Sequence, residues 1–207
     1  MFKAVKALLQ LRYIKQVFWA CWMLPFAWLI WGATNDALGA NPAEYLIRST
    51  GELTLRLLCV TLAITPLRQA FGMHALAKLR RMSGLLVFFY ACLHMLSYAW
   101  LDMGFEWLDV AKDIAKRPFI LVGFTSFVLL SLLAATSFNQ AVKWLGAKRW
   151  QMLHRAVYVI AALALLHFFW MRAGKNNFAD VWVYATIIVT LLAWRMMRKL
   201  KPNQQAK

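Results

Sequence analysis

Two of the four histidines, His94 and His167, lie inside long apolar stretches of the chain. Because an ionisable side chain is costly at membrane depth, a histidine there suggests a functional site. His94 follows Arg81 by 13 residues and His167 follows Arg155 by 12, which corresponds to about 20 Å and about 18 Å of helix. The two imidazoles should therefore lie at similar height. Two neutral imidazoles that face each other across an apolar gap are the axial ligands that a b-type haem needs.

The same pair of histidines is open to other interpretations. Membrane histidines also join helices through hydrogen bonds. A zinc site needs four ligands, or three and a water, and no third inward-facing cysteine, aspartate or glutamate is evident at that height. No carboxylate is expected near the pair or deep inside an apolar span. An iron with two histidine ligands has no open coordination position, so such a site would carry electrons and would not activate oxygen.

The other two histidines are weaker candidates. His154 precedes His167 by 13 residues, which on one straight helix places it about 20 Å lower and about 140° away around the axis. His154 can face the core only if the helix is wound or bent there, or if it uses a different neighbour. It is either a ligand or a polar residue at the helix end. A fourth ligand is not found at Leu108, 14 residues after His94. His74 is expected to be a solvated loop residue.

Four arginines are candidates for binding the anionic groups of a cofactor. Arg56 lies within the second apolar stretch and Arg172 follows His167 by five residues, so both are candidates for haem propionates. A local ion pair with Glu52 is the alternative for Arg56. Arg80 and Arg81 are candidates on the opposite, inner side. Contact with lipid headgroups is the alternative role for Arg80, Arg81 and Arg172.

The elements that must position these residues are membrane helices. Of the 207 residues, 62% are hydrophobic and only 15% are charged, which excludes a disordered chain and disfavours an ordinary soluble domain. A spanning helix needs about 20 mostly apolar residues. The sequence predicts an all-α bundle of six transmembrane helices in a single domain over 1–207, with spans at about 17–33, 53–67, 82–101, 119–136, 150–171 and 181–194.

Charged residues are sorted between alternate connections. The two termini and the connections after the second and fourth spans carry 17 basic residues and no acidic ones, whereas the other connections carry six basic residues and all eight acids. The positive-inside rule therefore predicts that both termini are cytoplasmic. The net charge of +16 is then explained by orientation and by contact with the lipid bilayer, and no nucleic-acid partner is expected.

Several motifs resemble one known family. They are TLAITPLR at 61–68, RRMSGL at 80–85, FYACLHMLSY at 89–98, KRPF at 116–119, WLG at 144–146 and WQMLHRAVY at 150–158. In this order and spacing they resemble the haem-binding membrane subunit of the bacterial periplasmic protein-methionine-sulfoxide reductase system, within the ferric-reductase-like transmembrane group. The resemblance covers the chain from Leu24 to about Trp194.

The resemblance implies a multi-pass b-type cytochrome of the bacterial inner membrane. It implies that electrons come from the quinone pool, in some accounts with bound FMN, and pass to a periplasmic molybdopterin-containing subunit that reduces methionine sulfoxide in oxidised envelope proteins. The family's ligand histidines fall on His94, His154 and His167. Relatives with two stacked haems have a second histidine on the third helix, which is absent here.

The resemblance also indicates what kind of oxidoreductase component to expect. The chain ends 13 residues after Trp194, too few for the FAD and NAD(P)H domain of oxidase relatives, so a quinol or a reduced flavin from a flavin reductase is the expected donor. Substrate reduction is expected on the partner, which makes this chain an electron-transfer subunit. The alternatives are a stand-alone ferric or quinone reductase of the same architecture, and a haem-free transporter or assembly factor.

Overall fold

The computed structural model describes residues 13–174 and 176–200, and within these ranges all regular structure is helical. Six helical segments are long and apolar enough to cross a membrane, which confirms the all-α class and the number of predicted spans. The elements are α2 (Ile14–Thr34), α3 (Pro42–Phe71), the 3-10 turn η1 (His74–Leu76), α4 (Ala77–Ser97), the π-helical turn η2 (Tyr98–Asp102), α5 (Trp107–Lys116), α6 (Pro118–Ala135), α7 (Asn139–His154), α8 (Val157–Ala173) and α9 (Ala179–Leu200).

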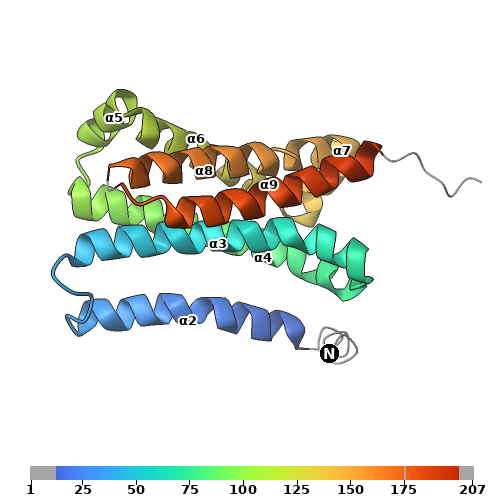
Figure 1. Cartoon of the computed structure of the whole chain (residues 1–207), viewed down its shortest axis with the longest axis horizontal. Helices are drawn as coiled ribbons and strands as arrows, with labels where there is room; N and C mark the ends of the chain where they lie inside the picture. The colour runs from blue at the N-terminus through green and yellow to red at the C-terminus, as the bar shows by residue number, and fades with distance from the viewer. Residues whose placement is uncertain (1–12, 175, 201–207) are drawn as a thin grey trace, which may run out of the picture.

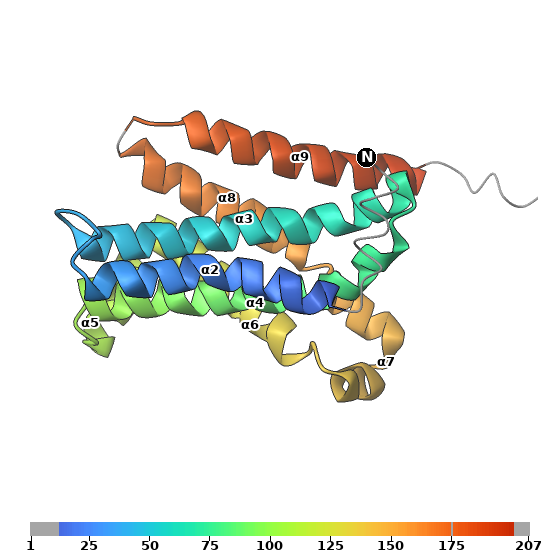
Figure 2. The ribbon, with the colours of Figure 1, turned by 90° about the horizontal axis from the view of Figure 1, so that it is seen from below.

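Four helices form a ring, and two more pack outside it (Figures 1 and 2). Within the ring α3 lies along α4 and α6 lies along α8, while α4–α6 and α3–α8 contacts close it, so α4 and α8 occupy opposite corners. Outside the ring, α2 packs on α4, and α9 packs on α3 and α8. We call the end with the start of α2 and the end of α9 the terminal end, and the opposite end, with α5, the distal end (Figure 1).

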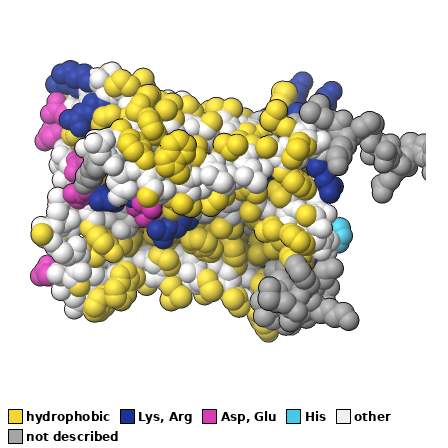
Figure 3. Space-filling model, viewed as in Figure 1, with side chains coloured by type: hydrophobic (Ala, Val, Ile, Leu, Met, Phe, Trp, Pro, Cys, Tyr) yellow, Lys and Arg dark blue, Asp and Glu magenta, His cyan; other side chains and the backbone are white. Residues whose placement is uncertain are grey.

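The surface of the bundle is apolar between its two ends. Hydrophobic side chains cover most of the middle of the face in Figure 3, and the acidic side chains, with some basic ones, lie at the distal end and a short way inward from it. Large residues such as Trp28 and Val189 are about 60% exposed, at 59% and 60%. Because lipid is the solvent for such a surface, the exposed apolar side chains need no protein partner. Interior packing and a few buried polar contacts, such as Thr61 Oγ1 to Ser83 Oγ at 2.6 Å between α3 and α4, hold the ring together.

Helix α3 is much longer than the predicted second span, because it begins at Pro42 and not near residue 53. Proline at the first helical position lacks the N–H that would be unpaired there. The Asn41 side chain caps the helix by accepting a hydrogen bond from the Glu44 backbone N–H at 3.1 Å. Glu52 is consequently the eleventh residue of a spanning helix. An acid therefore lies inside a helix that can span the membrane, although the predicted bounds placed it outside the second span.

The predicted fifth span is two helices. Helix α7 ends at His154 and α8 begins at Val157, with Arg155 and Ala156 between them. The calculation that placed His154 about 140° from His167 assumed one straight helix and does not apply. Because the hydrogen bonds at Arg155 and Ala156 run to the third preceding residue, the helix is wound differently there and the straight-helix angle between His154 and His167 is not kept.

Candidate functional site

His94 of α4 and His167 of α8 face each other inside the ring, with their ring centroids 6.3 Å apart. The two imidazoles lie at one level in the distal half of the bundle, as their spacing from Arg81 and Arg155 predicts. A metal–imidazole bond is about 2 Å long, and a ring centroid lies about 1 Å behind its nitrogen. Two imidazoles on opposite sides of one metal ion therefore have centroids about 6 Å apart, which the observed separation matches.

Each imidazole is oriented by one backbone carbonyl. His94 Nδ1 lies 2.9 Å from the carbonyl oxygen of Ile47 on α3, and His167 Nδ1 lies 2.7 Å from that of Phe119 on α6. A carbonyl only accepts hydrogen bonds, so each Nδ1 carries the proton and donates it. Each Nε2 then has a free lone pair, and neither Nε2 makes a hydrogen bond to any described residue. Metal-binding histidines are typically held by such a bond from the second ring nitrogen.

Two glycines allow the imidazoles to lie close to the neighbouring helices. A Cβ atom on Gly51 of α3 would come within 3.0 Å of the His94 ring, and one on Gly123 of α6 would come within 2.9 Å of the His167 ring. Sequence reasoning missed both glycines, because their contacts join residues more than 40 positions apart. All four helices of the ring thus contribute to the site, through two imidazoles, two carbonyls and two glycines.

Replacing Gly123 with alanine is expected to weaken haem binding. The added methyl group would push the His167 ring, and overpacking of this kind typically costs about 1–3 kcal/mol. We therefore expect about a tenfold loss of haem affinity, measured as the haem-to-protein ratio during titration of the purified apoprotein. Gly174→Ala at the end of α8 is the control, because a Cβ there meets nothing within 4 Å and the backbone has ordinary right-handed helical angles. Equal haem affinity in the two variants would contradict the role given to Gly123.

His154 lines a cavity of about 350 Å³ that lies nearer the terminal end of the ring than the histidine pair does. The ring of His154 stacks on Trp150 with centroids 4.0 Å apart, and its Nε2 lies 3.1 Å from Thr136 Oγ1. The turn between α7 and α8 is the bend that His154 needs to face the core. The structure thus brings His154 to the ring interior but not to His94 and His167.

The basic side chains at this cavity have no acidic neighbour among its lining residues. Arg80 and Arg81, both predicted candidates, line it, and Arg81 donates a hydrogen bond to Asn139 Oδ1 at 2.8 Å. Arg195 of α9 also lines it, with its guanidinium 5.0 Å from the Tyr158 ring centroid and its Nε buried without a hydrogen-bond partner. Sequence reasoning assigned Arg195 only to the charge pattern. The cavity therefore offers cations to an anionic group.

Leu108 is the wrong position for a fourth ligand, because it follows His94 in the chain, whereas a residue of α4 level with His154 precedes His94. Helix α4 runs from the terminal to the distal end (Figure 1), so the position level with His154 lies 13 or 14 residues before His94. Arg81 and Arg80 occupy those positions. Leu108 lies beyond this helix, in α5. His74 lies in η1 and is exposed, as expected.

The remaining two predicted arginines take part in an ion-pair network with two carboxylates. Arg172 Nη2 lies 2.8 Å from Glu52 Oε1 and 2.9 Å from Asp180 Oδ2. Arg56 Nη2 lies 3.0 Å from Glu52 Oε2, and its Nε donates to the Tyr184 hydroxyl at 3.2 Å. The local ion pair that was the alternative for Arg56 is thus present. Both cations are paired with carboxylates, and their predicted contact with haem propionates stays a prediction.

The network also bears on two of the alternatives. Glu52 follows Gly51 directly, so a carboxylate does lie at the level of the histidine pair, contrary to expectation. It is paired with two arginines and is not a free proton carrier of the kind that a transporter uses. A zinc site is not supported, because no cluster of three or more His, Cys, Asp or Glu side chains suited to a metal ion occurs in the described ranges.

Comparison with known proteins gives a consistent result. The family model of the ferric reductase like transmembrane component matches residues 50–165. The chain is 63% identical over 180 residues to the protein-methionine-sulfoxide reductase heme-binding subunit MsrQ of Polaromonas naphthalenivorans, covering 87% of this chain and 82% of the relative. It is 50% identical to the protein of the same name from Herminiimonas arsenicoxydans, covering 95% and 92%. It is 51% identical to that of Bordetella pertussis, covering 88% of each chain. No solved structure was found to match.

Proposed function

This chain belongs to the family of haem-binding membrane subunits of protein-methionine-sulfoxide reductase, and from that premise we propose that it carries electrons through a haem b held between His94 and His167. The observation that carries the proposal is the pair of facing imidazoles at 6.3 Å, each tethered through Nδ1 to a backbone carbonyl. Haem supplies an iron that exchanges one electron at a time. With two histidines as axial ligands, the iron has no open position for oxygen.

The protein's own groups keep the site ready for that cofactor. The Ile47 and Phe119 carbonyls fix the tautomer in which both Nε2 atoms can bind iron. Gly51 and Gly123 leave room for the rings to lie against α3 and α6. Apolar helices exclude water from the space between. Because both ligands are already oriented, little rearrangement accompanies a change of iron charge.

We place the terminal end in the cytoplasm and the distal end at the periplasmic face of the bacterial inner membrane. The support is the excess of basic residues, 17 against 6, in the segments at the terminal end. The haem then lies in the periplasmic half of the membrane. The connections at the distal end are short, so methionine sulfoxide is reduced on a periplasmic molybdopterin-containing partner, which takes electrons from this chain.

Electrons reach the haem from the quinone pool in this proposal. The basic cavity at His154 suits a second, anionic cofactor, either FMN through its phosphate or a second haem through its propionates. Arg80, Arg81 and Arg195 would hold the anionic group, because they line the cavity and no acidic residue lines it with them. A flavin reductase that delivers reduced flavin at the cytoplasmic face is the alternative donor.

Spectroscopy on the purified protein tests the proposal. In mild detergent, protein from haem-supplied cells is expected to show a Soret band and a low-spin b-type spectrum. After chemical reduction, the haem is expected to be reoxidised when the periplasmic partner and methionine sulfoxide are both added, and not when either is omitted. A colourless preparation would overturn the haem assignment. A haem that stays reduced with partner and sulfoxide present would overturn the assignment of the electron acceptor.

A further inference from the structure

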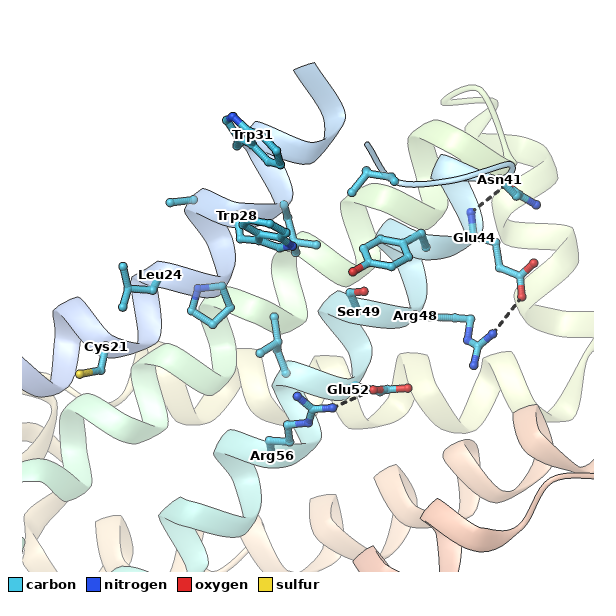
Figure 4. A pocket seen from close by; sticks show the side chains of 16 residues that line it. Cys21, Leu24, Trp28, Trp31, Asn41, Glu44, Arg48, Ser49, Glu52 and Arg56 are labelled. Atoms are coloured by element: carbon cyan, nitrogen blue, oxygen red, sulfur yellow. Dashed lines mark hydrogen bonds and ion pairs between the residues drawn. The ribbon is translucent and has the colours of Figure 1, made fainter. Parts of the chain in front are cut away.

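A large groove separates α2 from α3 in the distal half of the molecule (Figure 4). Its volume is about 1310 Å³. We call it the α2–α3 groove and define it by Leu24, Trp28 and Trp31 of α2 and by Tyr45, Ser49 and Glu52 of α3. Trp28 and Ser49 lie on facing sides of it in Figure 4. Neither His94 nor His167 lines this groove, whereas Arg56, a candidate for a haem propionate, does.

The walls of the groove are aromatic and open toward lipid. The Trp28 and Trp31 rings stack with centroids 4.9 Å apart at an interplanar angle of 30°. They are 59% and 49% exposed, and Tyr45 is 41% exposed. Because both helices are long and apolar enough to span the membrane, a molecule can enter this groove from the bilayer. Aromatic walls favour a flat ring, which stacks on them in offset or edge-to-face geometry.

The polar lining of the groove is electrically balanced. Arg48 pairs with Glu44 at 3.4 Å, and Arg56 pairs with Glu52 at 3.0 Å. Hydrogen-bonding groups are therefore present without a net charge, in contrast to the basic cavity at His154. Charge complementarity favours an uncharged head group with hydroxyl or carbonyl oxygens over the phosphate of an anionic lipid.

The groove lies on the opposite side of α3 from the histidine pair. Gly51 and Ile47, four residues apart, face the His94 ring, whereas Tyr45, Ser49 and Glu52 line the groove. A ring bound at Ser49 and Glu52 would thus be separated from His94 by the thickness of one helix, about 10 Å. This separation places a membrane-dissolved electron donor beside the haem without contact between them.

We propose that the α2–α3 groove binds the head group of a membrane quinol. The proposal rests on the function proposed above, which it supplies with a donor site. A quinol is uncharged, lipid-soluble and flat, with two hydroxyl groups that hydrogen bond to Ser49 and Glu52. Its oxidation to the quinone releases two electrons and two protons. The electrons would pass one at a time to a haem held by His94 and His167, and water at the nearby distal membrane surface would accept the protons.

Photo-cross-linking of the haem-loaded full-length protein in lipid nanodiscs tests the proposal. The probe is a decylubiquinone that carries a photoreactive azido group, and labelled peptides are mapped by mass spectrometry. We expect labelling within 21–31 and 45–56, and competition by unmodified decylubiquinone. Ser49→Trp would place a bulky ring in the groove opposite Trp28 and reduce this labelling about tenfold. The same variant should slow haem reduction by decylubiquinol about tenfold, while its haem content and its full reduction by dithionite stay unchanged.

Thr186→Trp is the matched control. Ser49 and Thr186 are each the eighth residue of a helix that begins at the distal end, and Thr186 is exposed on α9 away from the groove. The Thr186→Trp variant should be labelled by the probe as the wild type is, and its haem should be reduced by decylubiquinol at the same rate. Labelling confined to other segments, or labelling displaced by phospholipid but not by decylubiquinone, would overturn the quinol site. Groove labelling in a preparation that binds no haem would instead overturn the proposed function and leave the binding site standing.

Discussion

Replacing His94 or His167 with alanine is expected to remove the haem from the purified protein. Each imidazole supplies one of the two axial nitrogens, and the described chain holds no other histidine close enough to substitute, because His154 reaches Thr136 and Trp150 instead. Loss of a group that merely orients a ligand typically costs about 10–100-fold in metal affinity, so loss of the ligand itself should cost at least about 100-fold. The Soret absorbance per protein measures the effect.

Two controls separate loss of a ligand from loss of the fold. His74→Ala changes an exposed histidine in η1 and should keep full haem content. In the His94→Gly and His167→Gly variants, free imidazole added during haem loading should restore a low-spin spectrum, since it can occupy the vacated coordination position. Full haem content in both alanine variants would overturn the assignment of the site.

Replacing Arg172 with methionine is expected to produce the largest loss of stability outside the histidine pair. Its side chain is only 9% exposed and joins Glu52 of α3 to Asp180 of α9 from the end of α8. Breaking a buried pair leaves a carboxylate without its partner and typically costs about 3–5 kcal/mol. Asp180 is 54% exposed and Glu52 keeps Arg56, so we expect a smaller cost here, of about 2–3 kcal/mol, close to that of a lost charged hydrogen bond.

Thermal unfolding in detergent measures this difference. For a chain of this size, about 1 kcal/mol corresponds to about 2–4 °C in Tm, which predicts a decrease of about 5–10 °C for Arg172→Met. Arg48→Met is the matched control, because Arg48 is 43% exposed and its pair with Glu44 is 3.4 Å long. Exposed pairs of this kind contribute about 0.5 kcal/mol. A Tm for Arg172→Met equal to that of Arg48→Met would contradict the role of the network.

Gly51, Glu52 and Arg172 belong to one structural unit around the two imidazoles. Gly51 contacts the His94 ring, and the next residue, Glu52, binds both Arg56 and Arg172. Arg172 in turn follows His167 by five residues on α8. The ion pairs thus fix α3 against α8 within about one and a half helical turns of both imidazoles. We therefore expect Arg172→Met to lower haem retention on heating as well as the unfolding temperature.

The sequence by itself determined the features that depend on position along one helix. The apolar runs predicted six spans, and the helical rise predicted that His94 and His167 lie at one level. Both follow from distance along the chain, which a sequence contains directly. The bounds were less accurate where a cap decided them, as at Asn41 and Pro42, because capping extended α3 well beyond its apolar core.

Only the tertiary structure decided which groups meet across helices. The Nδ1 partners of the histidines are 47 and 48 residues away, and Glu52 meets Arg172 across 120 residues. Hydropathy and helical rise do not say which helices are neighbours or how each is rotated about its axis. The break between α7 and α8, next to His154 and its cavity, likewise lies inside one apolar run, where hydropathy does not reveal it. Lateral packing therefore decided the glycines, the ion-pair network and the α2–α3 groove.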